Sequence, residues 1–140
     1  MIERTKTIVA NMAVITLISL VLIGGNTWWR QQTQFQRGEA ALAKQDYMAA
    51  IAGYEASIHM YTPGSSTVEA AARRLWEIGE LFGREGDTER ALIAVRALRS
   101  SFYAARWLLQ PGEEWLARCD RKIAELLQRQ GYAASPLPVK

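Results

Sequence analysis

The stretch from Leu75 to Leu98, LWEIGELFGREGDTERALIAVRAL, predicts two helices joined by a short turn. Its apolar side chains recur three or four residues apart on both sides of the turn, which is the spacing of one helix face. The break falls at Gly86-Asp87-Thr88, where glycine and aspartate are typical turn residues. No breaker follows before Pro111, so we expect the second helix to be long, from Thr88 to Leu109.

The same pattern occurs once more, 41 positions earlier in the chain. The equivalent positions are Gly38 and Gly79, Ala50 and Ala91, and Tyr54 and Val95. A helix pair that is used twice explains this repeat. The small residues are needed because the distance between two paired helices depends on the side chains at their contact.

Residues 31–100 resemble two tetratricopeptide repeats. In the second copy the resemblance rests on Leu75, Ile78-Gly79, Phe82, Gly86-Asp87, Ala91 and Val95, and in the first on Gly38, Asp46-Tyr47, Ala50 and Tyr54. The spacing of 41 exceeds the family's period of about 34, and the extra length lies in YTPGSSTVEAAA. The resemblance implies a stack of helix hairpins with a protein-binding concave face. An unrelated five-helix bundle is the alternative.

Four breaks, at Gln45-Asp46 and at residues 62–66, 86–88 and 110–112, divide the chain beyond Asn26 into five helical segments. We therefore expect an all-α fold, in which an N-terminal transmembrane helix precedes two helix pairs and a C-terminal capping helix. The capping helix turns four side chains inward, Leu116, Cys119, Ile123 and Leu126. The predicted divisions are a short tail at 1–6, the span at 7–25, the helical domain at 26–130 and a flexible tail at 131–140.

A membrane anchor is predicted near the amino terminus. No charged residue lies between Lys6 and Arg30, and about 19 of these residues are apolar enough to cross a hydrocarbon layer of ~30 Å. Trp28, Trp29 and Arg30 follow the span, as expected of side chains at the level of the lipid headgroups. A cleaved signal peptide is the alternative, although LIGGNTWW lacks an A-x-A-type cleavage site.

Lysine and arginine flank the span on both sides, so the positive-inside rule alone does not decide its orientation. A long domain can be translocated largely regardless of its charge. We therefore expect the amino terminus in the cytoplasm and the helical domain in the periplasm, with the span in a bacterial inner membrane.

The residue inventory favours a protein that is not an enzyme and that holds no cofactor or metal. His59 is the only histidine and Cys119 the only cysteine, so an internal disulfide and a Cys/His metal cluster are excluded. The charge of +3, from 17 Lys and Arg against 14 Asp and Glu, is too small to indicate nucleic-acid binding.

By the tetratricopeptide resemblance, a partner protein binds along the first helix of each pair. The residues expected on this face are Phe35, Glu39, Leu42, Arg73, Trp76, Glu80 and Arg84. Because Leu75 fills the inward position, the neighbouring Trp76 is left to anchor a partner; packing under the YTPG connection is the alternative.

A second, basic and aromatic surface is predicted on the long helix. Its residues are Arg96, Arg99, Tyr103, Arg106 and Trp107. Such a surface suits acidic headgroups or an acidic protein patch, and a solvated arginine face is the alternative.

Together these features predict a membrane-anchored, tetratricopeptide-like adaptor that recruits or holds a partner protein at the membrane. The bilayer itself is contacted through residues 7–25. The alternative function is that of a small single-pass accessory subunit, whose helical domain braces a larger membrane complex.

Overall fold

The computed structural model describes residues 2–62, 64–105 and 112–131. Over these ranges the chain forms five helices and no strand, which confirms the all-α prediction. The helices are α1 (Ile2–Ala43), α2 (Tyr47–His59), α3 (Ser66–Glu85), α4 (Thr88–Ala104) and α5 (Glu113–Arg129). The predicted C-terminal tail lies, from residue 132 onward, outside the described residues.

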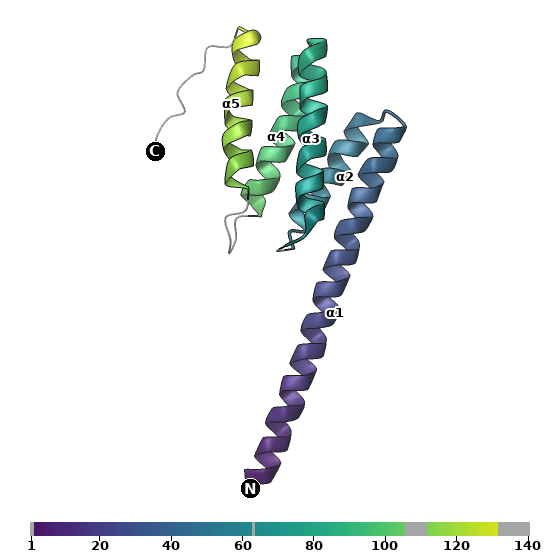
Figure 1. Cartoon of the computed structure of the whole chain (residues 1–140), viewed down its shortest axis with the longest axis vertical. Helices are drawn as coiled ribbons and strands as arrows, with labels where there is room; N and C mark the ends of the chain where they lie inside the picture. The colour runs from purple at the N-terminus through teal and green to yellow at the C-terminus, as the bar shows by residue number, and fades with distance from the viewer. Residues whose placement is uncertain (1, 63, 106–111, 132–140) are drawn as a thin grey trace.

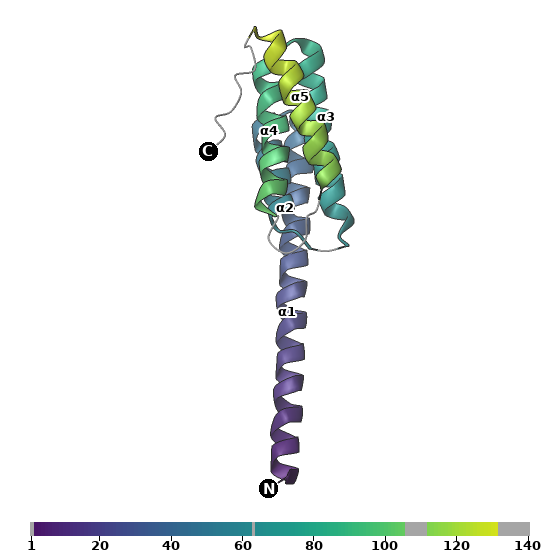
Figure 2. The same ribbon diagram turned by 90° about the vertical axis from the view of Figure 1, so that its left-hand side faces the viewer.

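Helix α1 runs without a break from the apolar N-terminal stretch into the helical domain (Figure 1). Its 42 residues correspond to about 63 Å of helix. The apolar side chains between Ile8 and Ile23 are exposed, and the N-terminal half of α1 projects from the domain in both views (Figures 1 and 2). Among the described residues, α1 is the one helix long and apolar enough to cross a membrane.

The C-terminal half of α1 pairs with α2, α3 pairs with α4, and α5 packs on α4 (Figure 2). The predicted inward residues of the third segment are all buried, namely Val68, Ala72, Leu75, Ile78 and Phe82. On α5, Leu116, Cys119 and Leu126 are buried and Ile123 is partly buried, as expected for a helix that covers the last hairpin. One apolar core therefore joins α2 to α5 and the adjoining half of α1.

The two hairpins have the same turn. Gln45 and Gly86, which are 41 positions apart, both have a positive φ, of 59° and 81°. The next residue caps the second helix in each case: Asp46 accepts from the backbone N–H of Ala49, and Asp87 from that of Arg90. An aspartate at this position satisfies one of the free N–H groups of the first helical turn.

The two hairpins also share one close helix contact. A Cβ atom added to Gly38 would lie 2.7 Å from the ring of Tyr54, and one added to Gly79 would lie 2.8 Å from Val95 Cγ2. The contact of the first hairpin thus recurs in the second hairpin at positions 41 residues later. Each hairpin needs glycine at this point because no side chain fits between its two helices.

The fourth helix is shorter than predicted: it ends at Ala104, and the prediction that it continues to Leu109 is wrong. Its last buried side chains are Ser101 and Phe102, and Phe102 packs directly on Gly112, just before α5. No glycine or proline in the sequence marks this end. Residues 106–109 lie outside the described ranges.

Polar contacts hold α3 beside α1. The Thr67 hydroxyl donates to Gln32 Oε1 at 3.0 Å, and the Arg74 guanidinium donates to both oxygens of Glu39, at 2.8 and 3.0 Å. Both contacts join residues 35 positions apart, so the two helices run parallel and in register. A residue on α3 therefore lies at the same height along the domain as the residue 35 positions earlier on α1.

A buried glutamine fastens the α2–α3 loop to α1. The side chain of Gln31 is fully buried, and its Nε2 donates to the carbonyls of Ser57 and Met60, at 3.2 and 2.9 Å. Its Oε1 accepts from Ser65 Oγ at 2.7 Å. Every polar group of this amide is thus satisfied, which fixes the loop at one height on α1.

Candidate partner-binding face

The side chains of two tryptophans and an arginine meet between α3 and α5. The rings of Trp76 and Trp115 are 6.1 Å apart at their centroids. The Arg118 guanidinium carbon lies 4.6 Å from the first centroid and 4.4 Å from the second, which is cation–π distance for both rings. Trp115 Nε1 donates to Glu69 Oε2 at 2.9 Å, so the ring is held from both sides.

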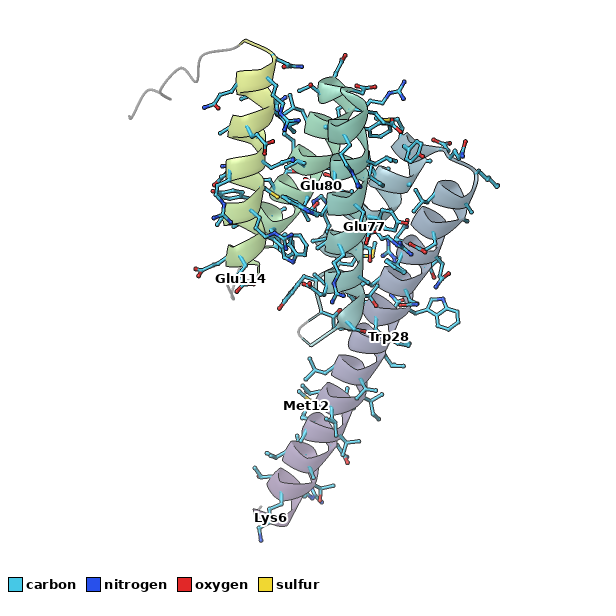
Figure 3. All side chains as sticks on the ribbon, turned by 45° about the horizontal axis from the view of Figure 1, so that its top comes forward. Lys6, Met12, Trp28, Glu77, Glu80 and Glu114 are labelled. Atoms are coloured by element: carbon cyan, nitrogen blue, oxygen red, sulfur yellow. The ribbon has the colours of Figure 1, made fainter. Side chains whose placement is uncertain are left out.

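An ionic cluster continues this face toward the C-terminal ends of the two helices. Lys122 lies between two carboxylates, 2.8 Å from Glu80 Oε1 and 3.5 Å from Glu125 Oε2. Its side chain is only 14% exposed, so the charge of this lysine is largely neutralised by ion pairs within the protein. Figure 3 shows Glu80 and Glu77 on α3 and Glu114 at the start of α5.

These residues line a hollow of about 220 Å³ between α3 and α5, which we name the α3–α5 groove. Its lining residues are Trp76, Glu80, Arg118, Arg121, Lys122 and Glu125. Arg118 and Arg121 are both exposed, and no carboxylate in the described part of the chain pairs with either. The groove therefore combines half-buried aromatic surface with two guanidinium groups that have no acidic partner there.

The predicted partner residues on α1 are engaged within the domain. The ring of Phe35 lies 5.6 Å from that of Tyr54, and Leu42 packs against the core. Glu39 accepts from Arg74 and, at 2.6 Å, from the Tyr54 hydroxyl. Burial alone raises the pKa of Glu39, but the hydrogen bonds from Tyr54 and Arg74 and the charge of Arg74 outweigh it and hold the pKa below 4.5.

The predicted partner residues on α3 fall into two groups. Trp76 and Glu80 lie in the α3–α5 groove, where Trp76 is half-buried against α5 and not under the YTPG connection. Arg73 and Arg84 are exposed; Arg73 pairs with Glu69 at 3.3 Å, and Arg84 donates to the carbonyl of Glu80. The structure thus joins Trp76 and Glu80 to α5, and not to the predicted residues of α1.

Three residues of the predicted basic surface, Arg96, Arg99 and Tyr103, lie on α4 within the described ranges. Arg99 pairs with Asp120 at 2.5 Å and lies over the ring of Tyr103. Arg96 is exposed and borders a second hollow, of about 440 Å³, between α4 and α5. Arg106 and Trp107 lie outside the described residues.

The predicted interface residues are exposed where α1 meets the domain. Trp28 and Trp29 are 52% and 69% exposed, and Arg30 is exposed beside them. Figure 3 shows Trp28 on α1 at the end of the domain from which the apolar stretch, marked by Met12, projects.

The groove residues on α5 were missed by sequence reasoning. Trp115 and Arg118 are three residues apart, and Arg118, Lys122 and Glu125 follow at helical spacing, so the pattern itself was visible. The missing information was that α5 lies against α3 as well as α4, which no local pattern gives.

No family model, curated protein or solved structure matches this chain.

Proposed function

We propose that this protein is a membrane-anchored adaptor, in which two tetratricopeptide-like hairpins hold a partner protein at the membrane through the α3–α5 groove. The observation that carries the proposal is α1, because one unbroken helix is both apolar enough to cross a membrane and the first helix of the first hairpin. The proposed anchor lies in a bacterial inner membrane, with the domain on the periplasmic side.

The chemistry of the groove indicates an acidic segment of the partner. Lys122 is neutralised by Glu80 and Glu125, whereas Arg118 and Arg121 keep their charge available. A guanidinium held against aromatic rings loses little side-chain entropy when it binds a carboxylate in a two-point contact. An acidic side chain or a chain-terminal carboxylate, with an apolar neighbour for the Trp76 ring, fits these groups.

The proposed membrane anchor supports this role because it raises the effective concentration of the domain near a membrane-bound partner. A domain tethered to the bilayer meets a membrane-bound partner at a high effective concentration, so that a weak contact suffices. A small groove is consistent with this kind of binding, since a contact of limited area is normally weak.

A photo-crosslinking amino acid at position 121 tests the proposed function. Arg121 lines the groove, whereas Ala52 is exposed on α2, away from the groove, and serves as the matched control position. In native membranes we expect one discrete adduct from position 121 and none from position 52. We expect the adduct to be reduced at least about tenfold by Arg118→Ala, the loss of one charge-assisted contact of about 1.5–3 kcal/mol.

Equal adducts from both positions, or none from position 121, would exclude the groove as the binding site. Adducts that instead come from cysteine or photo-probe positions within the span would favour the accessory-subunit function. Protease protection of the domain in intact cells tests the proposed side of the membrane.

A further inference from the structure

The described residues of the α2–α3 loop, 60–62 and 64–65, lie at the end of the domain that faces the apolar half of α1. Figures 1 and 2 both show α2 ending and α3 beginning at this end. The bonds from Gln31 to Met60 and Ser65 fix the loop at the level of residue 31. The loop therefore has a defined height above the proposed span.

This height is close to the thickness of a lipid headgroup layer. Gln31 follows Gly25, the predicted end of the span, by six residues, or about 9 Å of helix. The headgroup region adds about 5–8 Å to each side of the hydrocarbon core. A loop bonded to Gln31 therefore lies at the outer edge of the headgroups when the span occupies the hydrocarbon.

The composition of the loop suits that position. From Met60 to Val68 the chain reads MYTPGSSTV and contains no charged residue. Tyr61 is half-buried and Ser66 is exposed at the start of α3, so both an aromatic ring and a hydroxyl are present. On α1, the exposed rings of Trp28 and Trp29 lie at the same end of the domain. Such amphipathic side chains are favoured at the level of the headgroups.

We propose that the α2–α3 loop is a second membrane contact, which rests on the phospholipid headgroup layer and holds the domain upright on the bilayer. The inference rests on the proposed anchor, because the height of the loop is counted from the span. Since α1 and α3 are parallel, the α3–α5 groove then runs away from the bilayer and stays open to a partner along its length.

The two ends of α3 provide a matched pair of positions for a depth measurement. Ser66 and Glu85 are exposed end residues of one helix, about 28 Å apart. A nitroxide label is attached to a cysteine introduced by Ser66→Cys, Glu85→Cys or Ile15→Cys in the full-length protein. The native Cys119 is fully buried, and labelling of the unsubstituted protein serves as the control for it.

Each protein is reconstituted into vesicles of phosphatidylethanolamine and phosphatidylglycerol. Collision rates of the label are measured with oxygen, which concentrates in lipid, and with a water-soluble nickel chelate. We expect the ratio of oxygen to nickel collisions to be several-fold higher at position 66 than at position 85, and highest at position 15.

Equal ratios at positions 66 and 85, with a lipid-exposed label at position 15, would overturn the loop contact and leave the anchor intact. A water-exposed label at position 15 would overturn both. Thr62→Cys supplies a second label position in the loop in case the change at Ser66 disturbs the start of α3.

Discussion

Two glycines on α3 have different neighbours and should respond differently to substitution. The added methyl group of Gly79→Ala would lie 2.8 Å from Val95, a stiff side chain that is buried, and overpacking of this kind costs about 1–3 kcal/mol. In Gly83→Ala the new Cβ would be 3.8 Å from Leu126, an ordinary contact. We expect Gly79→Ala to lower the midpoint of thermal unfolding in detergent and Gly83→Ala to leave it unchanged or raise it, since alanine favours a helix by up to about 1 kcal/mol. Equal effects of the two changes would contradict the close helix contact.

The carboxylate of Glu39 should make stability depend on pH. Its pKa in the folded protein is below 4.5, so its contribution is complete above that pH and is lost as the pH falls toward the folded pKa. We expect Glu39→Gln to cost about 1 kcal/mol at pH 7, a value reduced by partial solvent exposure. In urea titrations, the difference between the two proteins should shrink as the pH is lowered through this range. A difference that stays constant between pH 7 and pH 3 would show that the ionised carboxylate is not what stabilises the contact.

Cys119 should be chemically inert in the folded protein. Burial, together with the neighbouring Asp120 carboxylate, raises the pKa of its thiol to about 12, and only the thiolate reacts readily with maleimides. We expect no modification at pH 7 in native conditions and complete modification after denaturation, measured by mass. Rapid modification of the folded protein would show that α5 does not cover the hairpins as described.

The arrangement of the first helices depends on one buried polar residue, Gln31, which fastens the α2–α3 loop to α1. Replacement by alanine removes the Gln31 amide donor from the carbonyls of Ser57 and Met60, and the Met60 carbonyl then keeps only the longer bond from Thr62 Oγ1, at 3.3 Å. We expect a loss of about 2–3 kcal/mol. Hydrogen exchange should also become faster in the loop at 60–65, which the glutamine fastens to α1. Gln36→Ala, at an exposed position of the same helix, should change stability by less than about 0.5 kcal/mol. If both variants unfold alike, the loop is held by other contacts.

Sequence periodicity was sufficient to predict the helices and their inward faces, because a repeated spacing of three and four residues reports burial directly. The repeat of Gly38 at Gly79 also predicted a close helix approach in each hairpin, whereas the side chains that meet these glycines, Tyr54 and Val95, are known from the structure alone. The end of α4 at Ala104 could not be predicted, because no breaker stands in the sequence before Pro111. The polar anchor at Gln31 was missed, although it lies four residues before Phe35 on the buried face of α1, because a search for periodic apolar residues passes over a glutamine.

The candidate site was predicted only in part. Trp76 and Glu80 do belong to the groove, but Phe35 and Leu42 pack inside the first hairpin and Glu39 joins the two hairpins. The resemblance assigned these residues by position within a repeat. The neighbouring helix that each side chain meets is a property of the whole fold: Phe35 meets Tyr54 on α2, whereas Trp76 meets Trp115 on α5.

At the scale of the whole molecule, the length of α1 between span and domain should control the height of the domain. Seven alanines inserted after Gly25 add about 10 Å of helix, so the domain moves away from the bilayer. They also add nearly two full turns, so the domain keeps almost the same rotation about the axis of α1. We expect the ratio of oxygen to nickel collisions of a label at position 66 to fall to the value found at position 85, while the unfolding midpoint of the domain stays the same. An unchanged depth would mean that α1 does not act as one rigid rod.

The central claim is that one continuous helix fixes this domain to a membrane. The most direct test is fractionation of cells that make the protein, with a carbonate wash of the membranes and sequencing of the recovered chain. We expect the protein to stay in the washed membranes and to retain residues 7–25. Recovery in the soluble fraction, as a chain that begins beyond Gly25, would contradict it.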